Sequence, residues 1–159
     1  MTRRFVFYGL FLSVLVATAT AQSTIFIVRH GEKVDSSNDS DLSEAGRARA
    51  EALAKMLKDK NITAVYATEF KRTQQTAAPL AKALGITVIT VQSKDKDALV
   101  AKLRASDGNA LVVGHGNTIP DLVKAFGISE PINIGENDYD NLFEIVLGEK
   151  PKLIHLHYH

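Results

Sequence analysis

The sequence contains no cysteine. A chain without thiols forms no disulfide bond, offers no thiolate nucleophile and builds no cysteine-ligated metal site, whatever the redox state of its compartment. It also lacks an excess of charge of either sign, because 19 Lys and Arg residues face 18 Asp and Glu residues, a net charge of +1. A nearly neutral surface has no electrostatic footprint for nucleic acid or for an anionic membrane surface. We therefore expect neither as a partner.

Long polar tracts, internal repeats and interdomain linkers are also missing. The 159 residues are 45% hydrophobic and 23% charged, as in an ordinary globular protein. This length is enough to bury one hydrophobic core. We therefore expect a single domain, over residues 22–159.

The first 21 residues differ in composition from the rest. A basic start at Met1–Arg4 precedes a nearly unbroken apolar run from Phe5 to Ala17, and Ala19-Thr20-Ala21 then places small residues where a signal peptidase cleaves. The apolar run is shorter than the roughly 18–20 residues that cross a bilayer, which favours a cleaved signal peptide over an uncleaved anchor. We expect cleavage before Gln22 and a periplasmic or secreted protein without a stable membrane anchor.

After residue 22, short β-rich runs alternate with helical patterns, which is typical of a mainly parallel sheet covered by helices. The sequence therefore predicts an α/β protein with three layers, α/β/α. The predicted strands are residues 25–28, 62–66, 86–91 and 110–113, with a closing antiparallel pair at 142–147 and 152–156. The predicted helices are residues 43–58, 70–84 and 95–104 and a short helix ending near Gly127.

The helix ends carry recognisable capping residues. Ser43 is a good N-cap for the first helix, whose apolar face consists of Ala50, Leu53, Ala54 and Leu57. Gly85 ends the second helix, where we expect a left-handed residue.

Side chains that can take part in catalysis or ligand binding follow three of the predicted strands. They are Arg29-His30-Gly31-Glu32, the segment 68–76 with Lys71 and Arg72, and Gly114-His115-Gly116-Asn117. In open α/β sheets, ligands bind beyond the carboxyl ends of the strands. We expect these segments to line one crevice.

Two histidines and two arginines in one crevice repel each other unless an anion lies between them. A phosphoryl group fits, because guanidinium groups bind its oxygens in bidentate fashion and a neutral imidazole nitrogen is a competent nucleophile. The chain has no cysteine and no G-x-S-x-G segment, so His30 is the best candidate nucleophile. We expect Gly31, Gly114 and Gly116 to let the backbone approach the phosphate.

Four segments resemble, in order, the motifs of the histidine phosphatase superfamily, which is phosphoglycerate-mutase-like in fold. They are Val28–Glu32, which carries R-H-G; Leu42–Gly46; Tyr66–Ala77, which carries the second arginine; and Val112–Gly116, which carries the second histidine. The motifs run from about residue 24 to residue 127 and resemble the short-chain branch.

The resemblance implies a role for each matching residue. His30 would form a phosphohistidine intermediate, and Arg29, Arg72 and His115 would hold the phosphate oxygens. Apart from the resemblance, Gly31, Gly116 and Asn117 are further candidates for phosphate contacts, although helix capping is the default explanation for Asn117. The resemblance implies no metal and no cofactor.

The chain departs from the family pattern in its proton donor. Many members carry a glutamate between the second-arginine and second-histidine motifs, but residues 85–108 contain none. Glu32, Glu69 and Asp140 are the remaining candidates, and for Glu32 we favour pairing with an arginine. A general acid contributes about 10²–10⁴-fold. Its absence would indicate a good leaving group or a proton supplied by the substrate.

The sequence therefore predicts a phosphomonoesterase that acts on a small phosphorylated substrate. Protein phosphohistidine is a second substrate class, which export disfavours. The alternative is a weak or inactive binder of a phosphorylated sugar or envelope component. His155, His157 and His159 alternate at the end of the chain, where a metal site is conceivable but a frayed strand is the expectation.

Overall fold

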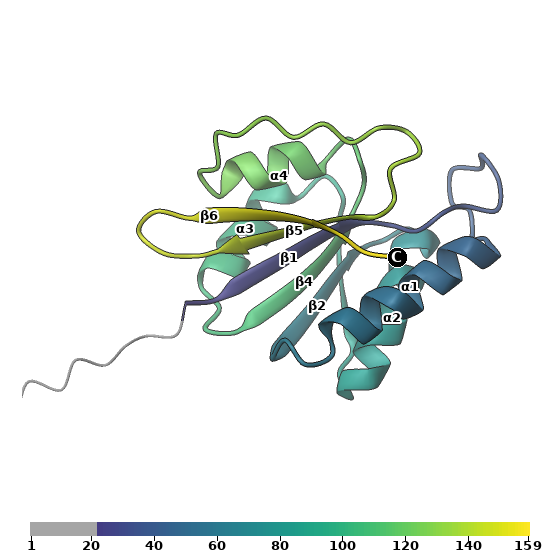
Figure 1. Ribbon diagram of the computed structural model, residues 1–159, viewed down its shortest axis with the longest axis horizontal. Coiled ribbons are helices and arrows are strands. Elements are labelled where there is room, and N and C mark those ends of the chain that lie inside the picture. The colour runs from purple at the N-terminus through teal and green to yellow at the C-terminus, as the bar shows by residue number, and fades with distance from the viewer. Residues whose placement is uncertain (1–21) are drawn as a thin grey trace, which may run out of the picture.

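The computed structural model describes residues 22–159, and the predicted signal peptide lies outside the described residues. One six-stranded sheet, in the order β3-β2-β4-β1-β5-β6, carries helices on both faces (Figure 1). The elements are β1 (Thr24–Arg29), α1 (Glu44–Leu57), β2 (Ile62–Thr68), α2 (Lys71–Leu84), β3 (Val88–Val91), α3 (Lys96–Arg104), β4 (Asn109–Gly114), α4 (Ile119–Ala125), β5 (Asn141–Val146) and β6 (Lys152–His157).

The four strands β3, β2, β4 and β1 run parallel, whereas β5 and β6 are antiparallel to their neighbours. The predicted three-layer α/β/α fold is confirmed. Strand β4 lies between β1 and β2, with Arg29 opposite Gly114 and Ala67 opposite Val113. The carboxyl ends of these three strands therefore finish side by side, and the segments that follow them share one edge of the sheet.

Each face of the sheet is covered by its own apolar core. On one face, buried residues of α1 and α2 pack against Phe26, Val28 and Leu111. On the other face, α3 and α4 cover Ile25, Ile27 and neighbouring residues. Strand β1 contributes side chains to both cores because successive residues of a strand point to opposite faces. Its continuous apolar run therefore predicted correctly a strand in the centre of the sheet.

The predicted helix ends are confirmed. Ser43 is the N-cap of α1, and its Oγ accepts a hydrogen bond of 3.1 Å from the amide of Gly46. Gly85 ends α2 in the left-handed conformation, with φ at 68°. The four apolar residues predicted for the inner face of α1 are all buried.

Two expectations need correction. The strand predicted for residues 86–91 begins at Val88, because the amide of Ile86 bonds to the carbonyl of Ala81 and extends the end of α2. The end of the chain is not frayed: β6 pairs with β5 from Lys152 to His157.

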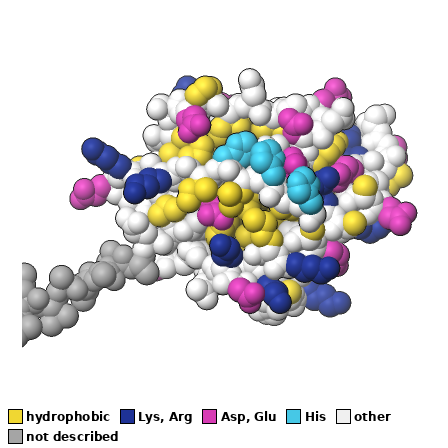
Figure 2. All heavy atoms as spheres, viewed as in Figure 1, with side chains coloured by type: hydrophobic (Ala, Val, Ile, Leu, Met, Phe, Trp, Pro, Cys, Tyr) yellow, Lys and Arg dark blue, Asp and Glu magenta, His cyan; other side chains and the backbone are white. Residues whose placement is uncertain are grey.

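One of the terminal histidines, His155, is held by neighbours on this strand pair. Histidine side chains form a row on the face shown in Figure 2. His155 Nε2 lies 2.7 Å from Asn141 Oδ1, and the His155 ring stacks on Phe143. Within residues 22–159, no group of three or more His, Cys, Asp or Glu side chains is arranged to hold a metal ion. None of the helices in this part of the chain is long and apolar enough to cross a membrane.

Candidate active site

His30 and His115 lie next to each other at the carboxyl edge of the sheet. The amide of His30 donates to the carbonyl of Gly114, which joins the ends of β1 and β4. The ring centroids of the two histidines are 5.4 Å apart, in an edge-to-face arrangement. Both side chains are buried, with 4% of His30 and 7% of His115 exposed. The fold thus brings together the two histidines that the sequence singles out, although 85 residues separate them in the chain.

One hydrogen bond fixes the tautomer of His30. Its Nδ1 lies 2.8 Å from the carbonyl oxygen of Gly31. A carbonyl only accepts, so Nδ1 carries the proton and Nε2 keeps its lone pair. Burial, helped by the charges of Arg72, His115 and Arg29 and opposed by the Gly31 bond, lowers the pKa of His30 to about 4. The ring is therefore neutral near neutral pH, as a nucleophile must be.

Gly31 has a different role from the one expected. Its amide donates to Thr76 Oγ1 at 2.9 Å and is not free to bind a phosphate. A Cβ at this position would lie 2.8 Å from the carbonyl oxygen of Gly46. Gly31 therefore lets the loop after β1 pack directly on the start of α1, and its carbonyl orients His30.

A chain of hydroxyl groups is hydrogen-bonded to His115 at its Nε2 atom. Its Nε2 lies 2.9 Å from Thr68 Oγ1, which lies 2.9 Å from Thr73 Oγ1, and Thr73 donates to the carbonyl of Phe70. On the other side of the ring, Arg72 Nη2 is 3.3 Å from Nδ1. A guanidinium only donates, so Nδ1 is the acceptor and Nε2 carries the proton.

The charge of His115 is controlled in the same way as that of His30. Burial, followed by the charge of Arg72, lowers the pKa of His115 to about 4. Thr68 and Thr73 are both buried, and the sequence placed them in a family motif without assigning them a partner. The signal that could have revealed them is the burial of hydroxyl groups, which requires partners.

The two arginines are anchored by one terminal nitrogen each. Arg29 Nη1 donates to the carbonyls of Gly135 and Glu136, at 2.9 and 2.8 Å. Arg72 Nη1 donates to the carbonyl of Asn38 at 2.7 Å. The guanidinium of Arg29 lies over the Tyr139 ring, 4.2 Å from its centroid. These contacts with backbone and ring set the direction of each planar donor fork.

The Nε atoms of Arg29 and Arg72 are buried and have no hydrogen-bond partner. Only four side-chain atoms of the described residues share this condition, and these two are the only nitrogens among them. An unpaired buried donor costs about 1–3 kcal/mol, more when it is charged, so native structures pair such groups.

The four predicted residues open onto a cleft with two lobes. The His30 lobe, of about 410 Å³, is lined by Arg29, His30, Lys33, Arg72, His115, Gly116, Asn117, Ile134, Gly135 and Glu136. The Ser93 lobe, of about 280 Å³, is lined by Phe70, Arg72, Ser93, Lys94, His115, Asn117 and Thr118. The lobes share Arg72, His115 and Asn117. The predicted contributions of Gly116 and Asn117 to the cleft thus fit their positions in its wall.

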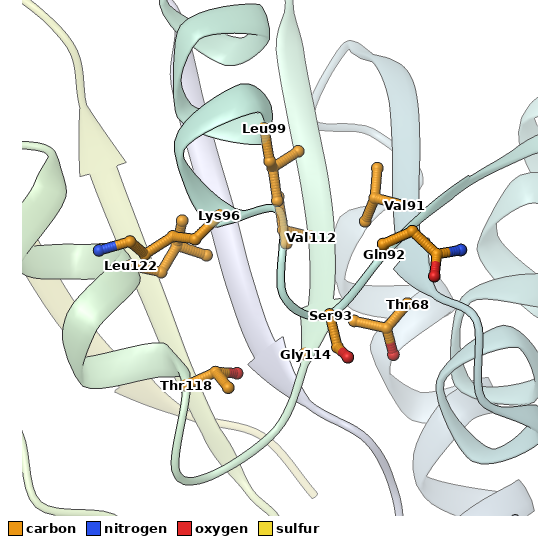
Figure 3. Close-up of a pocket in the computed structure, with 10 residues that line it drawn as sticks. All are labelled: Thr68, Val91, Gln92, Ser93, Lys96, Leu99, Val112, Gly114, Thr118 and Leu122. Atoms are coloured by element: carbon orange, nitrogen blue, oxygen red, sulfur yellow. The ribbon is translucent and has the colours of Figure 1, made fainter.

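A separate small cavity lies behind the Ser93 lobe. Leu99 of α3, Val112 of β4 and Leu122 of α4 surround it, together with Thr68 and Ser93 (Figure 3). Its volume of about 30 Å³ holds only one or two water-sized groups. Neither histidine lines it. The cavity is therefore a packing gap beside the two lobes.

Glu32 pairs with an arginine, as favoured, but the partner is Arg49. Arg49 Nε lies 3.0 Å from both carboxylate oxygens, and Nη2 lies 2.6 Å from Oε1. Burial alone would raise the pKa of Glu32, but the hydrogen bonds from Arg49 lower it overall. A carboxylate held ionised in this way is a poor proton donor.

Glu69 is tied to the next loop. Its two oxygens accept hydrogen bonds from the amide and hydroxyl of Ser93, at 2.8 and 2.9 Å. Burial would raise the pKa of Glu69, but its hydrogen bonds, including those from Ser93, lower it. Asp140, the third candidate acid, lies 3.2 Å from His157 Nδ1. Neither Glu69 nor Asp140 lines either lobe of the cleft.

The side chain of Lys71 is exposed to solvent, as predicted.

A family model described as "Histidine phosphatase superfamily (branch 1)" matches residues 25–95. This match covers the R-H-G segment and the second-arginine motif, and the structure brings both to the cleft. Over this segment the chain resembles the histidine phosphatase superfamily. Its second histidine, His115, lies outside the matched segment and joins the site through the pairing of β1 with β4.

The chain is 34% identical over 73 residues to a probable phosphoglycerate mutase of Yersinia pestis (strain Pestoides F). The alignment covers 42% of the chain and 34% of the relative, so it spans about a third of that protein's length.

Solved structures share the whole fold. A mycobacterial glucosyl-3-phosphoglycerate phosphatase aligns with a TM-score of 0.68 at 18% identity, over 86% of this chain and 98% of its own. The protein histidine phosphatase SixA in complex with tungstate gives 0.68 at 20% identity, over 84% and 96%. A phosphoserine phosphatase of Entamoeba histolytica gives 0.65 at 15% identity, over 86% and 96%. At these identities the likeness is one of fold.

Proposed function

We propose that this protein is a phosphatase that hydrolyses a small phosphate monoester through a phosphohistidine at His30. The observation that carries the proposal is the convergence of Arg29, Arg72 and His115 with His30 in the wall of one lobe of the cleft. Two fixed cationic donors beside a neutral imidazole suit a dianionic phosphoryl group.

In the first step, His30 Nε2 attacks phosphorus and the ester oxygen leaves. The hydrogen bond from Nδ1 to Gly31 aims Nε2 and balances the positive charge that forms on the ring. In a loose transition state, charge spreads over the three equatorial oxygens of the phosphoryl group. Arg29 and Arg72 stabilise this charge without reorganisation, because backbone carbonyls already hold their guanidinium groups.

In the second step, water attacks the phosphorus of phosphohistidine and the P–N bond breaks. The electron pair returns to His30 Nε2, and inorganic phosphate leaves. The lowered pKa of His30 assists this step, because the ring leaves as a neutral imidazole of low basicity. The residues that carry both steps are His30, Arg29, Arg72 and His115.

The fold relatives support an oxyanion in this cleft. Structures of the mycobacterial phosphatase were determined with VO3 and with inorganic phosphate, and that of the protein histidine phosphatase with tungstate. All three ions are oxyanions that two arginine forks can bind. The proposed substrate is therefore a phosphorylated molecule small enough to enter the two lobes, and the proposal includes no metal or other cofactor.

Export is a separate proposal. Residues 1–21 have the order of a secretory signal, so the enzyme would act in the periplasm or outside the cell. Expression of the full chain in a bacterium, followed by mass measurement of the protein released from the periplasm, tests this. A mass that begins at Gln22 supports export, and an uncleaved chain retained in the cytoplasm contradicts it.

The catalytic proposal is tested by hydrolysis of p-nitrophenyl phosphate in EDTA, with His30→Ala and the matched control His155→Ala. His155 is an exposed histidine of β6 and lines neither lobe. Turnover should persist in EDTA and in the control and disappear in His30→Ala. Equal turnover by all three proteins would show that another group is the nucleophile. No turnover by the unmutated protein between pH 4 and 8 would favour a binder of phosphorylated ligands.

A further inference from the structure

Departure of an alkoxide from phosphorus requires a proton, and the structure limits where that proton can be delivered. His30 is almost fully buried at the floor of its lobe. In phosphoryl transfer, the attacking and leaving atoms lie roughly in line with phosphorus. The leaving oxygen therefore points away from His30, toward the open mouth of the cleft. A proton donor for it must stand on the rim.

Only one carboxylate-bearing residue, Glu136, lines either lobe in the part of the chain that the structure describes. The other acidic candidates are engaged elsewhere. Glu32 lines a different hollow together with its partner Arg49, and Glu69 is held by Ser93. Glu136 is exposed, as a rim residue that exchanges protons with water must be.

The backbone of Glu136 is held in place by the phosphate-binding machinery itself. Glu136 lies in a tight turn in which the amide of Asp138 donates to the carbonyl of Gly135 and Asp138 Oδ2 accepts from the Gly135 amide. Arg29 Nη1 donates to the carbonyls of Gly135 and Glu136. The guanidinium of Arg29, a residue that lines the His30 lobe, thus also positions the turn that carries the carboxyl group.

We propose that Glu136 is the general acid of this enzyme and donates a proton to the oxygen of the leaving alcohol. The proposal rests on the phosphatase function proposed above. It accounts for the missing glutamate between the second-arginine and second-histidine motifs, because a carboxyl group from the loop before β5 takes that role.

The steps balance as follows. The bond from His30 Nε2 to phosphorus forms while the ester P–O bond breaks, and the carboxyl proton of Glu136 moves to the departing oxygen. The product alcohol leaves, and Glu136 is then a carboxylate. Water attacks phosphorus, the same carboxylate takes its proton, and the P–N bond breaks. Phosphate leaves, with His30 and the protonated Glu136 restored.

The test compares Glu136→Gln with the unmutated protein on two substrates that differ in their need for a proton. The p-nitrophenolate of p-nitrophenyl phosphate leaves unprotonated, whereas the alkoxide of an alkyl phosphate such as β-glycerophosphate does not. The variant should lose about 10²–10⁴-fold in kcat on the alkyl phosphate and no more than a few-fold on the aryl phosphate.

Glu130→Gln is the matched control, because Glu130 is an exposed glutamate of the same loop that lines neither lobe. It should match the unmutated protein on both substrates. Equal loss on both substrates in Glu136→Gln, or no loss on either, would overturn the proposal. Selective loss in Glu69→Gln instead would assign the role to that residue. Absence of all turnover in the unmutated protein would refute the phosphatase function itself, an outcome distinct from these.

Discussion

The hydroxyl of Thr68 holds the imidazole of His115, with 2.9 Å between Oγ1 and Nε2. The bond joins the end of β2 to the residue after β4, so it ties the two strands together at the site. It also fixes the ring so that Nδ1 faces Arg72. Behind Thr68, the chain of hydrogen bonds continues through Thr73 Oγ1 to the carbonyl of Phe70.

Thr68→Val should therefore weaken both the fold and catalysis. The variant keeps the shape of the side chain but leaves the Nε2 proton of His115 buried without a partner, which costs about 1–3 kcal/mol. Thr68→Ser should retain most of the free energy of unfolding and of kcat. Denaturant unfolding and kcat of the two variants provide the measurement. Equal behaviour of valine and serine would show that the hydroxyl does not orient the ring.

The buried histidines should make the fold sensitive to mild acid. The pKa of His30 and of His115 is lowered from 6.5 to about 4. The unfolded chain therefore binds more protons than the folded chain between these values. The free energy of unfolding should fall as the pH drops from 6.5 to 4, by up to about 3 kcal/mol for each histidine.

Denaturant unfolding at pH 7 and pH 4.5 measures this effect. His30→Gln should show a smaller difference between the two pH values than the unmutated protein. An unchanged difference in His30→Gln would mean that His30 does not titrate in this range.

An oxyanion should stabilise the protein through the two arginine forks. Tungstate at about 100 times its Kd should raise the free energy of unfolding by about 2.7 kcal/mol. Arg72→Lys should remove most of this gain and lower kcat/KM by about 10²–10³-fold, because a lysine cannot reproduce the planar fork. Arg104→Lys, at an arginine outside both lobes, is the control. Thermal unfolding with and without tungstate decides the point, and equal shifts in both variants would refute it.

The contact between Gly46 and the loop after β1 should tolerate no side chain. A Cβ on Gly46 would lie 2.3 Å from the carbonyl oxygen and 2.9 Å from the amide nitrogen of Glu32. Gly46→Ala should lower the free energy of unfolding by about 1–3 kcal/mol and lower kcat, because the loop that carries His30 must move. Gly114→Ala is the comparison for stability, since its nearest contacts would be 3.7 Å away. Equal stability of the two variants would contradict this packing argument.

The sequence alone was sufficient for those features that depend on neighbouring residues. The apolar run of β1 predicted a central strand, Ser43 and Gly85 predicted two helix ends, and the position of His30 after a strand predicted a place at the ligand-binding edge. Each of these features depends on local backbone preference or on burial along a single element. Both properties are determined by residues that are close together in the sequence.

The arginine that pairs with Glu32 could not be predicted from the sequence alone. The sequence indicated an arginine partner but could not choose among the arginines, and the fold places Arg49, one helix turn and a half into α1, against the carboxylate. The choice depends on how α1 packs on the loop after β1. That packing depends on the close contact between Gly31 and Gly46, which no local sequence pattern predicts.

Only the tertiary structure decided which groups meet in the cleft. The order of strands inserts β4 between β1 and β2, which places His115 against both His30 and Thr68. The loop before β5 returns Glu136 to the rim, more than 100 residues after the arginine that holds it. Such long-range contacts depend on the folding of the whole sheet and on closure of its loops. The sequence therefore predicted the histidine that we propose as the nucleophile, and the fold determined the groups that surround it.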